Sequence, residues 1–183
     1  MSRHKSRNKF KHLPDGTTVI FLEQRDGASF NCYIDTEDFP LVAAYRWCAA
    51  QGWTSFYAYT NSQGTTRAMH QLLMPSSDGR TPDHVDRDGL NNRRSNLRLA
   101  TKSQQAWNWG LLANNTSGVA GVHLHKKSRK WMARIAFNHK RIYLGSFSTL
   151  AEAAAARSQA VELYHGEFGV PVVAPNNEKK RAA

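Results

Sequence analysis

The alternation of apolar and polar residues between Gly118 and Phe147 constrains the fold more than any other feature of the sequence. It falls into three short pieces, which predicts three antiparallel strands that share one apolar face. Residues 149–166 follow with a helical pattern, in which Thr149 and Glu152 form a capping box and Gly166 supplies the C-terminal stop. We therefore expect a three-stranded antiparallel sheet packed on one helix.

The same alternation assigns the side chains of this sheet to two faces. The apolar face is expected to hold Val122, Leu124, Trp131, Ala133, Ile135, Phe137, Ile142 and Leu144. The helix is expected to meet it with Leu150, Ala153, Ala156, Ala160 and Leu163 or Tyr164. The opposite face would carry His123, His125, Lys130, Met132, Arg134, Arg141 and Tyr143. Because residues 126–141 contain seven Lys or Arg and no Asp or Glu, contact with phosphate is favoured over a merely solvated face.

The first half of the chain predicts a second, separate α+β unit. Its short runs TTVIFLE, SFNCYID and SFYAYT are rich in β-branched and aromatic residues, with turn formers between them, and indicate a small antiparallel sheet. A short helix is expected after Pro40, and the apolar stretch AMHQLLMP leads into the polar segment at residues 82–99.

That segment, PDHVDRDGLNNRRSNLRL, admits three hypotheses. A calcium loop would have Asp86, Asp88 and Gly89 in place, but both end carboxylates are missing because His84 and Ser95 stand there. A polar hairpin accounts for the glycine and asparagines, but not for an Asp-His pair entering the turn. Phosphodiester hydrolysis needs a divalent ion and a base to activate water, and one carboxylate beside one histidine supplies both.

On these residues the chain resembles the HNH endonucleases, in particular their phage-type and homing-type members. The resemblance covers residues 66–110 and rests on the Asp-His pair, DGLNNRRSNLRLAT and the following SQQAWN. It implies a ββα-metal unit with a strand ending at Asp83-His84, a second strand at about residues 96–101 and a helix from Lys102.

The resemblance also implies a role for each motif residue. His84 would be the general base, Asp83 a metal ligand, and Asn96 the asparagine that braces the loop and orients the imidazole. The family's third motif position, a His or Asn, is Gln105 here, which is a departure; Asn108, one turn later, is the alternative ligand. The expected cofactor is Mg2+, with Mn2+ as an alternative and no zinc. His70, isolated in an apolar stretch, is expected to be structural rather than catalytic.

The C-terminal region resembles the AP2 DNA-binding domain. The fragments SGVAGV, KWMARI, KRIYLGSF, TLAEAAAA and HGEF keep that family's order and spacing over residues 117–168. In AP2 domains the sheet enters the major groove, so the resemblance implies DNA contacts from His123, His125, Lys130, Arg134, Arg141 and Tyr143. His123, His125 and Ala120 stand where plant members tend to have Arg, which favours a preference set by phosphate contact and DNA shape.

Charge and composition agree with a nucleic-acid partner. The formal net charge is +11, which favours a polyanionic partner. No apolar run approaches the roughly 18 residues of a membrane span. Cys32 and Cys48 are isolated in the sequence, and we expect both to be free, buried thiols. We expect a cytoplasmic, nucleoid-associated protein of a bacterial host, encoded by a phage or mobile element and acting as a monomer or weak dimer. An RNA partner is the weaker alternative.

Together these expectations describe an α+β protein of five segments. They are a basic flexible arm (1–12), an HNH endonuclease domain (13–110), a linker (111–117), an AP2-like domain (118–170) and a tail (171–183). The predicted function is metal-dependent cleavage of double-stranded DNA, positioned by the C-terminal domain. The alternative is a decayed nuclease that only binds DNA, with Gln105 marking the loss.

Overall fold

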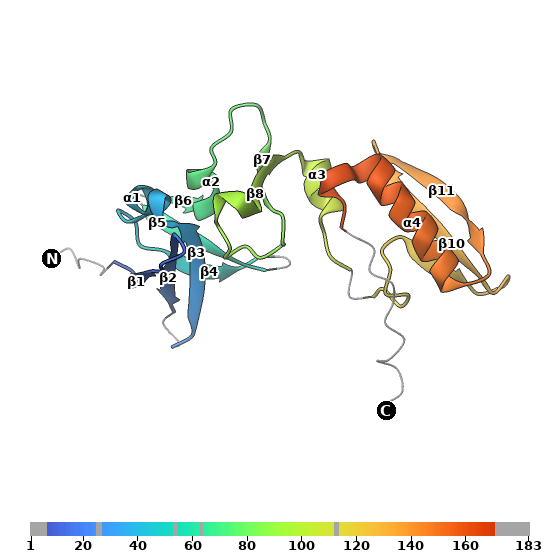
Figure 1. Ribbon diagram of the computed structural model, residues 1–183, viewed down its shortest axis with the longest axis horizontal. Coiled ribbons are helices and arrows are strands. Elements are labelled where there is room, and N and C mark those ends of the chain that lie inside the picture. Colours follow the sequence, from blue (N-terminus) through green and yellow to red (C-terminus); the bar gives the residue numbers. More distant parts are fainter. Residues whose placement is uncertain (1–6, 25–26, 53–54, 63, 112–113, 171–183) are drawn as a thin grey trace. The chain divides into compact units, whose positions relative to one another are not determined.

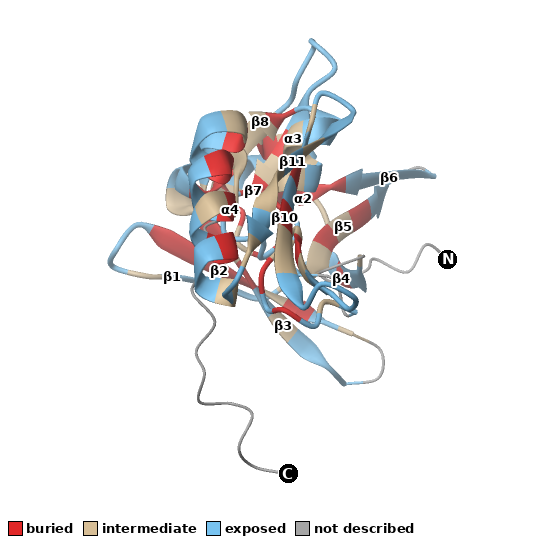
Figure 2. Cartoon of the chain, turned by 90° about the vertical axis from the view of Figure 1, so that its right-hand side faces the viewer, coloured by how far each residue is buried: buried red, intermediate tan, exposed pale blue. Residues whose placement is uncertain are grey.

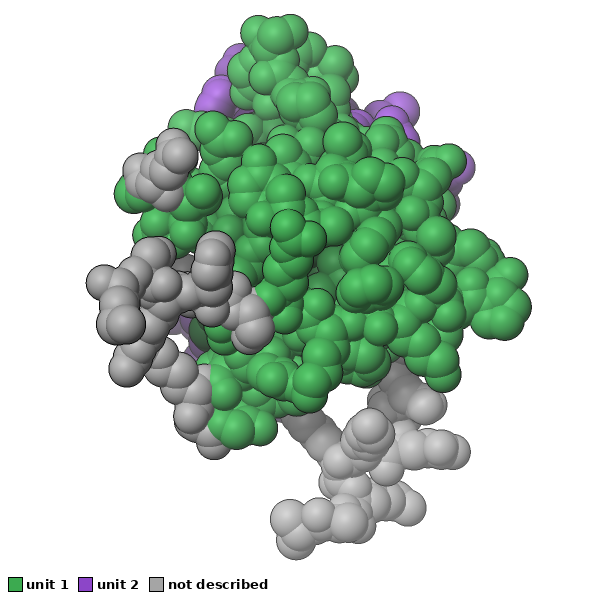
Figure 3. Space-filling view, turned by 90° about the vertical axis from the view of Figure 1, so that its left-hand side faces the viewer, with its two compact units in different colours: residues 1–102 green, residues 103–183 purple. Residues whose placement is uncertain are grey.

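The computed structural model describes residues 7–24, 27–52, 55–62, 64–111 and 114–170, and these form two compact units (Figures 1 and 3). The units are residues 1–102 and 103–183, so the division falls just after the second strand of the predicted ββα segment. Residues 1–6 of the expected arm, 112–113 of the expected linker and the tail at 171–183 lie outside the described residues. The protein is a mixed α/β structure with several small antiparallel sheets and few helices.

The first unit contains two three-stranded antiparallel sheets, each with its strands side by side in chain order. One sheet is β1 (Phe10–His12), β2 (Thr17–Glu23) and β3 (Ser29–Asp35). The other is β4 (Cys48–Gln51), β5 (Phe56–Ser62) and β6 (Thr65–Ala68). Three helical segments accompany these sheets: a 3-10 turn at Thr36–Asp38, α1 (Phe39–Val42), which follows it with Pro40 in its first turn, and α2 (Met69–Leu73).

Apolar side chains from both sheets and both short helices form one core. Leu22, Ile34, Val42 and Met69 are fully buried, and Trp47 joins them with its indole N–H donating to the Val42 carbonyl at 2.9 Å. A buried indole needs such an acceptor, because its N–H would otherwise lose its hydrogen bond to water. Cys32 is buried in this core, whereas Cys48 is exposed, contrary to the expectation that both thiols are buried.

The end of the expected flexible arm is ordered against the first sheet. Residues 10–12 pair with β2, and the Asn8 side chain donates to the carbonyls of Phe21 and Trp47 and accepts from the Trp47 backbone N–H at 2.7 Å. The arm prediction therefore does not hold for residues 8–12. Local composition did not indicate this order, because the Asn8 side chain bonds to a carbonyl 39 residues away.

The motif segment forms a hairpin followed by a helix, as the resemblance implied. β7 (Thr81–His84) pairs antiparallel with β8 (Leu97–Ala100), and α3 (Lys102–Trp107) follows directly. A 3-10 turn at Arg94–Asn96 leads into β8. The helix ends at Trp107 and is shorter than the pattern SQQAWNWGLL suggested.

The second unit consists mainly of one sheet and one long helix. β9 (Val122–His125), β10 (Lys130–Phe137) and β11 (Lys140–Phe147) form an antiparallel sheet with β10 in the centre. The helix α4 (Leu150–His165) packs on it and begins with the predicted Thr149–Glu152 capping box; a 3-10 turn, Gly166–Phe168, follows. In α3, Trp107 stacks on His165 at 4.4 Å between ring centroids, which places α3 with this unit.

Burial along α4 decides between the two predicted alternatives at its end and adds a buried cation that the pattern did not indicate. Its buried residues lie along one side of the helix (Figure 2) and include Ala153 and Ala160. Leu163, however, is 75% exposed, and Tyr164 is the residue that packs on the core. Arg157 is buried, with its Nε donating to the Ala120 carbonyl at 3.0 Å. Periodicity alone did not find Arg157, since a buried cation contradicts the apolar pattern on which such predictions depend.

The sheet likewise departs from the predicted apolar face at one position. Leu124, near the end of edge strand β9, is 36% exposed. Edge strands are covered on one side only, so their terminal residues are packed less completely.

Arg94 ties the motif loop to the first sheet of its unit. Its backbone N–H donates to Asp35 at 2.7 Å, and its guanidinium makes a two-pronged contact with the buried Asp38 carboxylate at 2.9 and 2.6 Å. Two parallel hydrogen bonds suit a planar guanidinium and not an ammonium group.

We expect Arg94→Ala to lower the free energy of unfolding by about 1–3 kcal/mol, because Asp38 would remain buried without its partner. Arg94→Lys should recover only part of the loss. Urea denaturation of both variants measures this, with Arg80→Ala as a matched control whose ion pair to Asp78 is surface-exposed and worth little. An Arg94→Ala variant as stable as the control would contradict the expectation.

Within the described residues, no helix is long and apolar enough to span a membrane.

Candidate active site and nucleic-acid interface

The end of strand β7 places the Asp-His pair on opposite sides of the hairpin. Asp83 stands opposite Arg98 and His84 opposite Leu97 in the β7–β8 register. Adjacent residues of a strand face opposite ways, so the two side chains enter different surroundings. Asp83 meets the Arg98 guanidinium, whereas His84 turns inward and is only 5% exposed.

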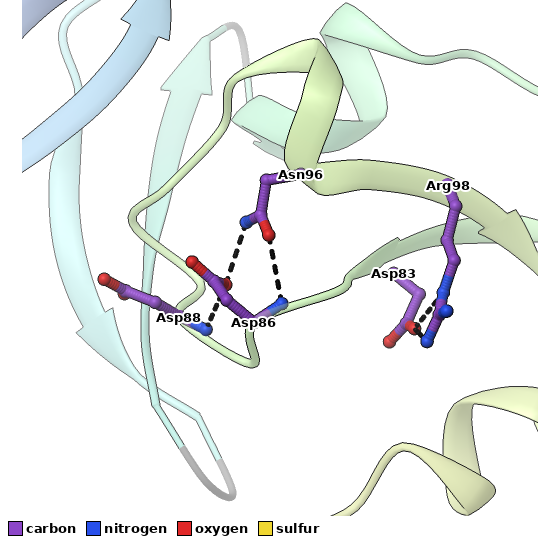
Figure 4. Close-up of polar contacts among 5 residues, drawn as sticks. All are labelled: Asp83, Asp86, Asp88, Asn96 and Arg98. Carbon is purple, nitrogen blue, oxygen red and sulfur yellow. Dashed lines mark hydrogen bonds and ion pairs between the residues drawn. The ribbon is translucent and has the colours of Figure 1, made fainter. Parts of the chain in front are cut away.

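Asn96 holds together the loop that follows His84 (Figure 4). Its side-chain oxygen accepts from the backbone N–H of Asp86 at 3.0 Å, and its nitrogen donates to the Asp86 carboxylate and the Asn91 carbonyl, each at 2.8 Å. Asp86 also accepts from the Asp88 backbone at 2.8 Å. Burial alone would raise the pKa of Asp86, but the hydrogen bonds from Asn91, Asp88 and Asn96 outweigh it and hold that pKa below its ordinary value. The ionised carboxylate is therefore part of the loop's internal scaffold.

A different asparagine contacts the imidazole. The Nε2 atom of His84 lies 3.2 Å from Oδ1 of Asn92, and Asn92 is fully buried. The same amide donates through Nδ2 to the Gly89 carbonyl and to the Cys32 sulfur, both at 3.3 Å. Asn96 was expected both to brace the loop and to orient the imidazole. In the structure Asn96 contacts the loop, whereas Asn92 contacts the histidine.

Two further rings surround His84. Tyr57 and His70 lie edge-to-face against it, with ring centroids 5.7 and 5.1 Å away. Burial lowers the pKa of His84, while its hydrogen bond to Asn92 and the charges of Asp86, Asp83 and Asp88 oppose that shift. A histidine whose pKa is lowered is neutral at neutral pH, which is the form that accepts a proton.

His70 is buried beside this histidine, and its Nδ1 has no hydrogen-bond partner within the described part of the chain. Burial, followed by repulsion from His84, lowers its pKa to about 4. Its buried position on α2 agrees with the expected structural role, although the sequence alone did not place it against His84.

His70 makes the stability of the protein depend on pH. Its folded-state pKa lies below the ordinary 6.5, so the unfolded chain binds the proton more tightly. The stability that neutral His70 contributes is complete above pH 6.5 and is lost as the pH falls towards 4, a loss of about 3 kcal/mol in the free energy of unfolding.

We expect His70→Phe to remove this loss of stability at acid pH. Urea unfolding from pH 4.5 to 7.5 measures the slope, and Tyr57→Phe, which alters a neighbouring ring but removes no histidine, should keep it. A native slope in His70→Phe would contradict the assignment.

Asp83 is paired with a cation in the structure. Arg98 donates to its Oδ2 through Nε at 3.1 Å and Nη2 at 3.0 Å, and both side chains are 13% exposed. Gln105 lies on α3 and Asn108 directly follows that helix, so both predicted amide ligands belong to the second unit. Among the residues that the structure describes, no three His, Cys, Asp or Glu side chains cluster as a metal-binding group. The predicted metal ligands, Asp83, Gln105 and Asn108, would not form such a cluster in any case, because two of the three are amides.

The strand register of the second unit brings the predicted DNA-binding residues onto one face. Arg134 pairs with Tyr143, Lys130 with His125, and Met132 with His123. Directly paired residues share a face, and Arg141 joins them because its partner Ala136 is two residues from Arg134. The register shifts between Ala133 and Arg134, and Leu144 packs against the core.

This face is exposed as well as basic. His125, Lys130, Arg134 and Arg141 are exposed, His123 is partly buried, and Tyr143 is 58% exposed. The described residues of the second unit therefore offer cations and one flat aromatic ring on a single sheet surface.

Comparisons with known proteins bear on the motif segment and on longer parts of the chain. A family model described as HNH endonuclease matches residues 70–107, from α2 to the end of α3. Protein 3.8 of Escherichia phage T7 is 32% identical over 94 residues, which cover 51% of this chain and 77% of that protein. Residues 70–107 of this chain are an HNH endonuclease domain.

A second relative is similar over more of the chain than this HNH endonuclease domain. It is named "Uncharacterized HNH endonuclease L560", from Acanthamoeba polyphaga mimivirus, and is 26% identical over 160 residues, which cover 85% of this chain and 81% of the relative. No solved structure matches the chain. HNH endonucleases are nucleases that act on DNA and generally use a divalent metal ion.

The oxygen donors of the HNH segment suit such an ion. A carboxylate and side-chain amides are hard ligands of the kind that Mg2+ and Mn2+ accept. The ion pair with Arg98 competes for Asp83, so a metal would share this carboxylate with the guanidinium.

Proposed function

We propose that the chain is a metal-dependent endonuclease of double-stranded DNA in which His84 is the general base. The observation that carries this proposal is the buried His84 at the end of β7, with Nε2 against an amide oxygen and the Asp83 carboxylate beside it in the sequence. This pair lies inside the segment matched by the HNH endonuclease model.

The reaction proceeds by attack of water on phosphorus. His84 takes a proton from the water as the new oxygen–phosphorus bond forms, and the bond from phosphorus to the 3′ oxygen breaks. The departing oxygen then receives a proton from solvent. A neutral His84 is required at the start, and its burial favours that form.

Asp83, Gln105 and Asn108 would hold the divalent ion, probed as Mg2+ or Mn2+. When bound, such an ion neutralises charge on the scissile phosphate and on the leaving oxygen. Gln105 carries one methylene more than the family's Asn, so its amide must be held by its surroundings to serve as a ligand.

The second unit positions the nuclease on DNA. His123, His125, Lys130, Arg134, Arg141 and Tyr143 would contact the duplex, as the resemblance to AP2 domains implies. Cations on a sheet neutralise phosphates, and guanidinium groups also reach guanine edges in a major groove. Tethering such a surface to the nuclease raises the local concentration of DNA at His84.

A second candidate function is a DNA-binding protein that has lost cleavage. Two observations favour it: Gln105 replaces the usual third motif residue, and Arg98 already neutralises Asp83. In that case the metal-finger fold would survive as a further DNA contact.

Cleavage of supercoiled plasmid separates the two functions. The chain would be incubated with Mg2+ or Mn2+, beside a matched reaction with EDTA, at about 100 mM salt so that simple electrostatic binding is damped. Nicked or linear product in the metal reactions alone is the expected result. Tight retention of plasmid without any product would favour the DNA-binding candidate, and Gln105→Asn would then test whether one ligand accounts for the loss.

A further inference from the structure

We propose that Asn92 is the positioning residue for His84, selecting the imidazole tautomer that carries its proton on Nε2 and its lone pair on Nδ1. The inference deepens the proposed function, since it rests on His84 being the base. It starts from the 3.2 Å contact between His84 Nε2 and Asn92 Oδ1. Neither the HNH motif residues nor the sequence pattern assigned a role to Asn92.

The orientation of the Asn92 amide follows from its other partners. The Gly89 carbonyl can only accept a hydrogen bond, so the atom 3.3 Å from it must be the donating Nδ2. Nδ2 also lies 3.3 Å from the Cys32 sulfur, a weak acceptor. Turning the amide over would set two oxygens against each other at Gly89. Oδ1 therefore faces the imidazole.

The backbone of Asn92 is held as firmly as its side chain. Its N–H donates to the Tyr33 carbonyl at 2.7 Å, and the Tyr33 N–H donates to the Leu90 carbonyl at 2.8 Å. These bonds attach the motif loop to β3 of the first sheet. Asn92 is also 0% exposed, so water does not compete for its amide. The acceptor thus stands at a fixed point beside His84.

A fixed acceptor decides the tautomer of a neutral imidazole. Only a protonated Nε2 can donate to Oδ1, which leaves Nδ1 as the basic nitrogen. When His84 gains a proton in the reaction, the Nε2–H bond becomes charge-assisted and strengthens. Asn92 acts through His84 and touches neither water nor phosphate in this scheme, so it is a positioning residue.

Asn96 does not duplicate this role. Its amide is used within the loop, on Asp86 and Asn91. Loss of Asn96 would loosen the loop, whereas loss of Asn92 would release the ring.

Nitrogen NMR of the histidine side chains in the full-length, metal-free chain tests the proposal directly. At about pH 8, where an ordinary imidazole is neutral, the two ring nitrogens of His84 have distinct shifts that identify the tautomer. We expect the native chain to show the Nε2–H form alone. An Nδ1–H form, or an even mixture, in the native chain would overturn the proposal without recourse to any variant.

Variants then test whether Asn92 is the cause. Asn92→Ala should give a mixture of tautomers and lower kcat for plasmid cleavage by about 10–100-fold with KM little changed. Asn91→Ala is the matched control, because this neighbour contacts Asp86 and Arg93 and should keep the single tautomer. A single Nε2–H form and native kcat in Asn92→Ala would refute the assignment.

The two readouts separate this inference from the proposed function. If the native chain cleaves no DNA but shows the Asn92-dependent tautomer, the nuclease proposal fails and the positioning contact stands. If it cleaves DNA and the tautomer is independent of Asn92, the positioning proposal fails alone. If Asn92→Ala does not fold, the tautomer of His84 in the native chain alone tests the positioning proposal, which requires the Nε2–H form.

Discussion

Cleavage of supercoiled plasmid by the His84→Ala variant is expected to fall by about 10²- to 10⁴-fold, the range for loss of a general base. The variant keeps Asp83 and the loop scaffold around Asn96, so binding of DNA should be nearly unchanged. The expected loss is therefore in kcat and not in KM. Single-turnover cleavage in Mg2+ or Mn2+ measures it.

His84 is buried, so its removal also changes packing, and the experiment needs a structural control. Thermal unfolding of the variant shows whether the unit remains folded. His12→Ala removes a histidine from β1 of the same unit and is expected to cleave at the native rate. Native cleavage by a folded His84→Ala variant would refute the proposed base, and equal losses in both variants would point to a general effect on folding.

The second large effect is expected at the sheet of the second unit. Replacing both Arg134 and Arg141 by alanine should weaken binding to duplex DNA by about 10–10³-fold, since each removed guanidinium costs about 1–3 kcal/mol if it reaches a base and less if it meets only phosphate. Each lost phosphate contact should also reduce the slope of log K against log salt by about 1. Titration of labelled duplex at several salt concentrations gives both quantities.

The alternative explanation is a simple loss of positive charge. Arg67 is exposed on β6 of the first unit, and Arg67→Ala removes the same charge from a surface with no predicted DNA contact. Each single variant, Arg134→Ala and Arg141→Ala, should weaken binding more than this control. Equal losses in all three would show that net charge, and not the sheet face, attracts the DNA.

Short-range patterns predicted the elements that carry these effects. The capping residues Thr149 and Glu152 marked the start of α4, and alternation marked β9 to β11. The Asp-His pair marked the end of β7, and α3 begins at Lys102 as the resemblance implied. These features depend on neighbours within a few residues, which is why sequence alone sufficed.

The sequence did not predict the surroundings of His84. Tyr57 and His70 come from β5 and α2, and nothing in their own segments indicates that they meet this imidazole. The ion pair of Asp83 with Arg98 follows from the strand register, which the hairpin pattern left open.

The chain's sequence by itself predicted the mixed α/β class, the strands and long helix of the second unit and the basic face of its sheet, and it singled out His84 as the candidate base, because strand and helix periodicity, caps and motif spacing are local. Only the tertiary structure decided that Asn92, and not Asn96, meets His84, since Asn92 is oriented by Gly89 and by Cys32, which lies 60 residues away on β3. It also ordered residues 8–12 against β2. Contacts across such separations depend on how the core closes, and a buried amide takes whichever orientation pairs its donor and its acceptor.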